Sequence, residues 1–122
     1  MTLSLEEIEK ELKLRFPHGH GKFIPMLIEE AKLHSEKNYD YAKGGNPLGN
    51  FMRVASILTF YPGLPVNDPA TIALVYALKQ IDAYLWMKCQ KYEGGVEGKA
   101  ARLGDISVYV KLARILEEES AK

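Results

Sequence analysis

The stretch that decides the fold spans residues 67–92 and reads NDPATIALVYALKQIDAYLWMKCQKY. Asn67 and Asp68 offer a side-chain cap, and Pro69 follows at the first helical position, where proline is tolerated. The run after Pro69 is apolar on more than one face. A helix of this kind needs covering on most sides. The segment therefore predicts a long central helix in a helical bundle.

Four further helices are predicted from caps, from glycine and proline breaks, and from apolar residues at helical spacing. The expected ranges are about 5–16, 23–42, 51–61 and 97–120. No stretch alternates in the way that indicates a strand, and the short connections favour antiparallel neighbours. We predict an all-α fold in a single domain over residues 1–122, with a four-helix core bundle and an extra short N-terminal helix.

Composition excludes several classes of protein. Sixteen Lys and Arg residues balance sixteen Asp and Glu residues, which disfavours bulk nucleic-acid binding. Cys89 is the only cysteine, so no internal disulfide can form, and we expect a small buried side chain there. No stretch approaches the roughly 20 apolar residues of a membrane span, and the start of the chain is too acidic for a signal peptide. We expect a cytoplasmic protein with no membrane contact.

The apolar helix also bears on assembly. A chain of 122 residues has few other helices to cover it. We therefore expect a homodimer or homotetramer, in which helices pack across a two-fold axis.

Carboxylates interrupt the apolar stripes of three predicted helices, at Asp40, Asp82 and Asp105. An isolated buried charge is very costly, so each of these must be paired, protonated or metal-bound. Helix bundles hold Mg²⁺ or Mn²⁺ with carboxylates from facing helices. Lys37, Lys79 and Arg53 could then neutralise a polyphosphate. Asn38 or Asn50 could bind a base or sugar.

An ordinary structural interpretation of the same acids stays open. Asp82 can pair with Lys79 one turn away, and Asp105 can act as a cap or pair with Arg102. Asp40 can be solvated near the end of its helix.

Four short motifs resemble those of small phage-borne helical proteins that are described as nucleotide-modification-associated. The motifs are HSEKNYDY (34–41), NFMRVA (50–55), LK (78–79) and DISVY (105–109). These proteins are in turn similar to the all-α nucleoside-triphosphate pyrophosphohydrolases of the MazG type. The match covers about residues 27–116, and it implies a MazG-like fold and, for a phage-encoded chain, the host cytoplasm.

The resemblance implies Mg²⁺-dependent, or Mn²⁺-dependent, cleavage of a (deoxy)nucleoside triphosphate between its α and β phosphates. Asp40 and Asp105 would be catalytic, and the lysines at 37 and 79 would bind phosphate. Tyr109 would orient Asp105 or line the pocket. Together with Asp82 from the stripe pattern, the expected metal ligands are Glu29, Glu30, Asp40, Asp82 and Asp105.

The chain departs from the MazG-type pattern in its acids. Leu33 stands where a third acid would follow Glu29 and Glu30, and Arg102 stands where an acid would precede Asp105 by three residues. The first metal site is therefore incomplete. This leaves an alternative open, in which the chain is a non-catalytic, oligomeric helical module that binds nucleotide or a protein partner.

Overall fold

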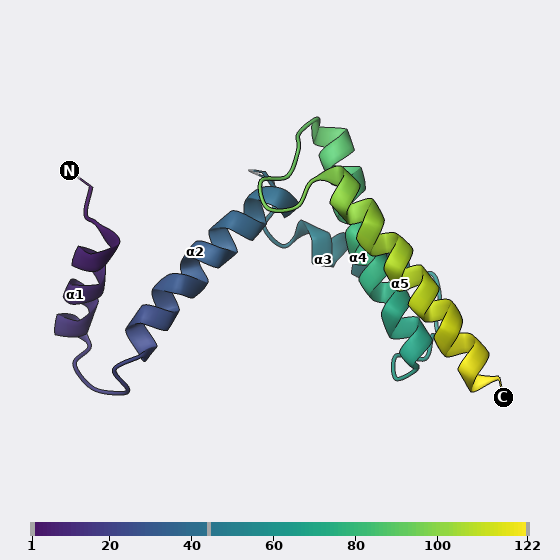
Figure 1. Cartoon of the computed structure of the whole chain (residues 1–122), viewed down its shortest axis with the longest axis horizontal. Coiled ribbons are helices and arrows are strands. Elements are labelled where there is room, and N and C mark those ends of the chain that lie inside the picture. Colours follow the sequence, from purple (N-terminus) through teal and green to yellow (C-terminus); the bar gives the residue numbers. More distant parts are fainter. Residues whose placement is uncertain (1, 44, 122) are drawn as a thin grey trace. The chain divides into compact units, whose positions relative to one another are not determined.

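The computed structural model describes residues 2–43 and 45–121, and within these ranges the chain forms five helices and no strand. In chain order (Figure 1) the helices are α1 (Leu5–Arg15), α2 (Phe23–Tyr41), α3 (Gly49–Leu58), α4 (Pro69–Gln90) and α5 (Lys99–Ser120). The predicted all-α class is confirmed, and each of the five expected helices is present.

Two helix starts form as their sequences predict. The Ser4 hydroxyl accepts from the Glu7 N–H at 3.1 Å, and the Glu7 carboxylate accepts from the Ser4 N–H, which completes a capping box on α1. The Asp68 carboxylate accepts from the Thr71 N–H at 3.1 Å at the start of α4, with Pro69 in the first turn. These bonds satisfy backbone donors that a helix start leaves without a partner inside the helix.

The chain divides into two compact units, Met1–Glu36 and Lys37–Lys122. The first unit holds α1 and most of α2, and α1 contributes no buried residue. Apolar side chains of both helices, among them Leu12 and Leu27, border a cavity of about 710 Å³ in this unit. None of residues 2–36 is buried, so the described part of the first unit lacks the buried core that stabilises a folded domain.

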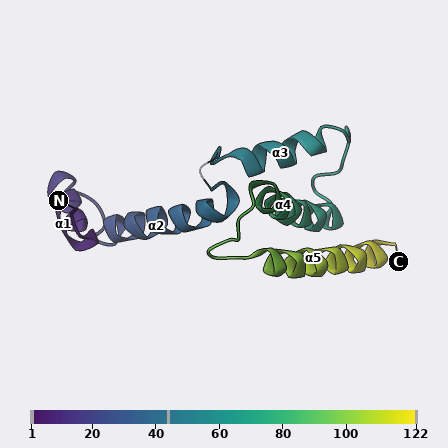
Figure 2. The ribbon, with the colours of Figure 1, turned by 90° about the horizontal axis from the view of Figure 1, so that it is seen from above.

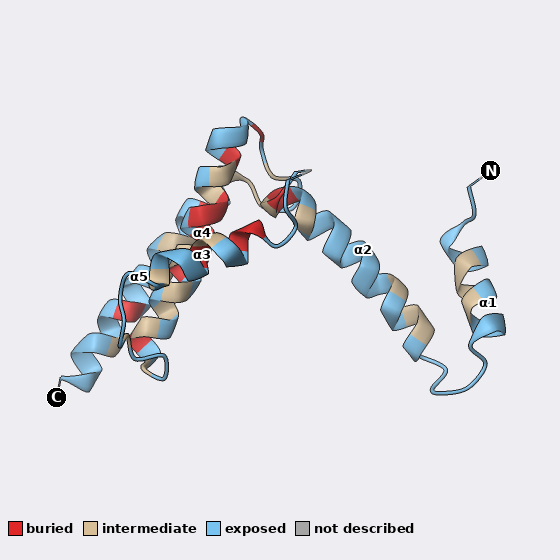
Figure 3. Ribbon diagram, turned by 180° about the vertical axis from the view of Figure 1, so that it is seen from behind, coloured by how far each residue is buried: buried red, intermediate tan, exposed pale blue. Residues whose placement is uncertain are grey.

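The second unit is built around α4. Figure 2 shows α4 between α3 and α5, and α4 packs against both of them. Its buried apolar side chains (Figure 3) are mostly small or flexible, and they are Ala42, Val54, Ala70, Ala77, Ala83, Met87 and Ala113, together with Tyr92. Small side chains let the helix backbones approach closely. The main helix packing in this unit is that of α4 against α3 and α5. The four-helix core with a MazG-like arrangement stays a prediction.

One stripe of α4 is apolar and exposed. Leu74 is 50% exposed and Leu85 is 57% exposed. Cys89 is exposed as well, so the expectation of a buried thiol is wrong, because this residue lies on the same stripe as the two leucines. Although several helices carry apolar surface, none in the described ranges is long and apolar enough to cross a membrane.

Candidate functional site

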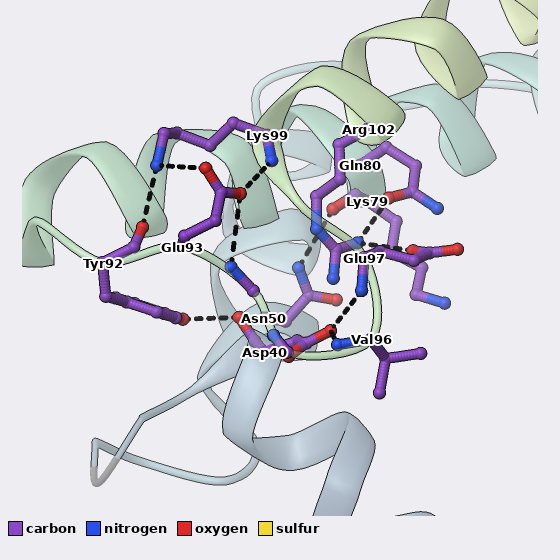
Figure 4. Close-up of polar contacts among 12 residues, drawn as sticks. Asp40, Asn50, Lys79, Gln80, Tyr92, Glu93, Val96, Glu97, Lys99 and Arg102 are labelled. Carbon is purple, nitrogen blue, oxygen red and sulfur yellow. Dashed lines mark hydrogen bonds and ion pairs between the residues drawn. The ribbon is translucent and has the colours of Figure 1, made fainter.

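A cleft of about 120 Å³ in the second unit brings polar side chains of three helices next to the loop between α4 and α5. It is lined by Lys37, Asp40 and Tyr41 of α2, Lys79 and Gln80 of α4, Val96 and Glu97 of the loop, and Arg102 of α5. Figure 4 shows most of these side chains around the Arg102 guanidinium. The cleft is the candidate functional site.

Asp40 holds the loop that borders the cleft. Its carboxylate is 1% exposed and accepts three consecutive backbone N–H groups. One oxygen accepts from Gly95, and the other accepts from Val96 at 2.8 Å and from Glu97 at 2.7 Å. Successive N–H groups that converge on an anion form a nest, and hydrogen bonds to a charged acceptor are stronger than neutral ones. The alternative in which Asp40 is solvated is therefore wrong, and its carboxylate anchors the loop.

Both ends of the loop are fixed by further polar contacts. The Tyr92 hydroxyl donates to the Asp40 main-chain carbonyl, and burial, followed by the negative charge of Asp40, raises the pKa of this phenol. The Glu93 carboxylate accepts from the Lys99 backbone N–H and pairs with the Lys99 ammonium at 3.0 Å. These hydrogen bonds from Lys99 lower the pKa of Glu93. The loop is thus tied to α2 at one end and to the start of α5 at the other.

Asp82 is buried and is paired inside the second unit. Arg53 donates from Nε to one carboxylate oxygen at 2.7 Å and from Nη2 to the other at 2.9 Å, and Asn50 donates to the second oxygen at 2.8 Å. The hydrogen bond to Asp82 raises the pKa of Arg53, whose guanidinium also lies 4.4 Å from the centre of the Trp86 ring. The partner of Asp82 is therefore Arg53 and not Lys79. Arg53, which was expected to bind phosphate, is engaged by Asp82.

Arg102 is the buried cation of the cleft. Its side chain is 1% exposed, and Nη1 donates to the Gln80 side-chain oxygen at 2.6 Å and pairs with Glu97 at 3.2 Å. The guanidinium lies 4.4 Å from the centre of the Tyr41 ring. Within the described part of the chain, the buried Nε–H has no hydrogen-bond partner. Buried polar groups nearly always have partners, so this donor points to a group that the chain itself does not supply.

Arg102 was not predicted as a site residue. In the sequence it was considered as a partner of Asp105 and as a departure from the MazG-type acid pattern. The contact partner is Glu97 instead. A signal was present in the sequence, because Arg102 lies eleven residues before Ala113, and this spacing places both on one side of a helix. Ala113 is buried, so the stripe that runs through it also buries Arg102.

The two lysines expected to bind phosphate both line the cleft. Lys37 and Lys79 are exposed, and the Lys79 ammonium lies 5.1 Å from the centre of the Tyr41 ring. The acids of the cleft are Asp40 and Glu97. Because backbone N–H groups already meet the charge of Asp40, the remaining field in the cleft is positive.

Two other residues expected to bind substrate have different contacts. Asn38 donates from its side-chain amide to the Pro47 carbonyl at 3.3 Å. Tyr109 packs edge-on against Tyr76 of α4, with ring centres 5.6 Å apart. Neither residue lines the cleft.

The expected metal ligands are distributed over both units. Glu29 and Glu30 are exposed in the first unit, whereas Asp40, Asp82 and the half-buried Asp105 belong to the second. Asp40 and Asp82 each accept three hydrogen bonds on their two oxygens. In residues 2–43 and 45–121, no group of three or more His, Cys, Asp or Glu side chains is placed to hold a metal ion. This donor set does not fit magnesium as described, and the Mg²⁺ or Mn²⁺ site stays a prediction.

Comparisons of the chain with protein-family models, curated proteins and solved structures find no match.

Proposed function

We propose that the second unit binds the phosphate groups of a nucleotide in the cleft between α2, α4 and α5. The observation that carries this proposal is Arg102, a buried guanidinium with an Nε–H that no described group accepts. Lys37 and Lys79 border the same cleft and add two exposed positive charges.

Phosphate suits this arrangement chemically. A guanidinium offers a planar edge of N–H donors that matches two phosphate oxygens, while lysine ammonium groups act as mobile point charges. The described partners of Arg102 use Nη1, so the edge formed by Nε and Nη2 can face an incoming anion. Charge attraction is also stronger in a buried site than in water.

The size of the cleft limits what it encloses. Its volume of about 120 Å³ is well below the roughly 300 Å³ at which small-molecule pockets begin. The cleft therefore takes phosphate groups, and the nucleoside lies outside it. The geometry argues for phosphate, and the nucleotide part of the proposal rests on the resemblance of motifs such as NFMRVA (50–55).

Hydrolysis of a (deoxy)nucleoside triphosphate to a monophosphate and pyrophosphate is the second candidate function. The observation that favours it is Asp105, which is half-buried on α5 three residues after Arg102. None of the acid pairings described above involves Asp105. Among Asp40, Asp82 and Asp105, it is therefore Asp105 whose carboxylate the described pairings leave available for chemistry.

Calorimetric titration with a deoxynucleoside triphosphate tests the binding proposal. Lys79→Ala removes a cleft lysine, and we expect a loss of affinity of about tenfold, since one charge contact to phosphate is worth about 1.4 kcal/mol. Lys88→Ala is the matched control, because Lys88 is also exposed on α4 and also lies over a tyrosine ring, that of Tyr84. Equal affinities of the wild type and both variants, or no binding by any of them, would reject the proposal.

Release of pyrophosphate tests the second candidate. A panel of ribo- and deoxyribonucleoside triphosphates is incubated with Mg²⁺ or Mn²⁺, for the wild type and for Asp105→Asn in parallel. Activity that disappears in the variant would add catalysis to binding. Binding without release of pyrophosphate would leave a non-catalytic nucleotide-binding module.

A further inference from the structure

Glu97 is an acid in a cleft that otherwise attracts anions. Its carboxylate lies 3.2 Å from Nη1 of Arg102, and its side chain is 41% exposed. Arg102 itself is almost completely buried. One partner of this ion pair is thus fixed inside the unit, and the other reaches the solvent.

The backbone of Glu97 is held in place independently of its side chain. Its N–H donates to the Asp40 carboxylate at 2.7 Å, as do the N–H groups of the two preceding residues. The Glu97 side chain can therefore leave Arg102 by rotating, while the loop keeps its three hydrogen bonds to Asp40.

We propose that the Glu97 carboxylate is a built-in competitor: it supplies the counter-charge of Arg102 through Nη1, and it leaves when a phosphate group on the Nε and Nη2 edge takes over that role. The inference rests on the proposed phosphate binding and names a regulation of that same site. The carboxylate supplies the negative charge that Arg102 needs when no ligand is bound, because a buried guanidinium without a counter-charge is costly. A phosphate brings more charge than a carboxylate and has the exposed lysines as additional partners, so it replaces Glu97 as the counter-charge of Arg102.

Competition by Glu97 predicts in which direction the affinity for anions changes when its charge is removed. A ligand that must displace an internal group has an apparent affinity equal to its intrinsic affinity multiplied by the fraction of molecules that are free to bind it. Here these are the molecules in which Glu97 does not contact Arg102. Removing the charge of Glu97 should therefore tighten anion binding, although it removes an ion pair from the protein. A purely structural Glu97 that positions Arg102 for the ligand predicts the opposite sign.

Calorimetric titration with inorganic pyrophosphate tests the inference. We expect Glu97→Gln to bind about tenfold more tightly than the wild type, and Glu97→Ala at least as tightly, because alanine also removes the hydrogen-bond acceptor. Glu93→Gln is the matched control, since it removes the same charge from the same loop while its partner is Lys99 and not Arg102. The control should bind within about twofold of the wild type, because exposed charges are screened by salt.

Different results would overturn the competitor role of Glu97 and the binding of phosphate in the cleft. If both Glu97 variants bind pyrophosphate as weakly as the wild type or more weakly, while Lys79→Ala still reduces affinity, the competitor role is wrong and phosphate binding stands. If Glu93→Gln gains as much as Glu97→Gln, the gain comes from net charge, and the competitor role is again wrong. If the wild type and the Glu97 variants all fail to bind, both proposals fail together.

Discussion

Replacing Asp40 with asparagine should lower the free energy of unfolding by about 3 kcal/mol. The Asp40 carboxylate accepts three backbone N–H groups, one on one oxygen and two on the other. Asparagine has one acceptor oxygen. If that oxygen takes the position that accepts two N–H groups, two bonds are retained, and the amide N–H₂ faces the Gly95 N–H, which loses its acceptor. The lost bond to a charged group costs about 1.5–3 kcal/mol, and the two retained bonds weaken because the charge is gone.

Urea unfolding, followed by the helical circular-dichroism signal, measures this change. The buffer contains a chelator, so that no divalent metal contributes to the stability of either protein. Glu36→Gln is the matched control, because Glu36 is an exposed acid on the same helix. We expect the control to lie within about 0.5 kcal/mol of the wild type, as substitutions at exposed sites usually do.

The metal-ligand hypothesis predicts a different result for the same variant. A carboxylate that serves a metal has its charge unmet when the metal is removed, so asparagine would leave the stability in chelator unchanged or would raise it. An Asp40→Asn protein that is as stable as the wild type would therefore refute the loop-anchoring role of Asp40.

Three further predictions concern pH and assembly. Because burial raises the pKa of Tyr92, its contribution to stability is present below the pKa of the unfolded phenol and is lost as pH rises through the folded value. Urea titrations at alkaline pH should therefore show a smaller loss of stability for Tyr92→Phe than for the wild type. An identical loss would count against the buried phenol. Because hydrogen bonds from Lys99 lower the pKa of Glu93 from its ordinary value of 4.5, this contribution is present above that value and is lost as pH falls through the lowered one. Glu93→Gln should therefore be less stable than the wild type near neutral pH and equal to it in strong acid, and a difference that persists in acid would contradict the assignment. Because Leu74 and Leu85 form an exposed apolar stripe, sedimentation velocity should show a dimer or tetramer that Leu85→Lys shifts toward monomer, whereas a monomeric wild type would end the oligomer hypothesis.

Local sequence signals predicted the helices well because each signal acts over a few residues. Ser4 with Glu7, and Asp68 with Pro69, place their helix starts through bonds and sterics that span one turn. Packing between helices, in contrast, depends on residues that lie far apart in the sequence. Whether the exposed side of α4 is covered depends on side chains elsewhere or in another copy, and spacing along one helix does not contain that information.

The acids predicted to face inward show the same difference between local signals and contacts with distant residues. Spacing predicted that Asp40 and Asp82 face inward, and both are buried. Their partners could not be predicted, because Asp40 bonds to N–H groups 55 to 57 residues later and Asp82 to an arginine 29 residues earlier. Backbone donors in a loop carry no mark in the sequence, so a carboxylate that binds them resembles one that awaits a metal.

The phosphate-binding role of the cleft is tested most directly at Arg102 itself. Proton–nitrogen NMR spectra resolve arginine Nε–H groups that are buried and exchange slowly, and the Arg102 signal is assigned by its absence in Arg102→Lys. Titration with pyrophosphate should shift this signal and saturate at the concentrations that calorimetry gives, as the Nε–H gains an acceptor. A signal that stays in place while pyrophosphate saturates the protein would show that the anion binds elsewhere, and it would contradict the assignment of the cleft.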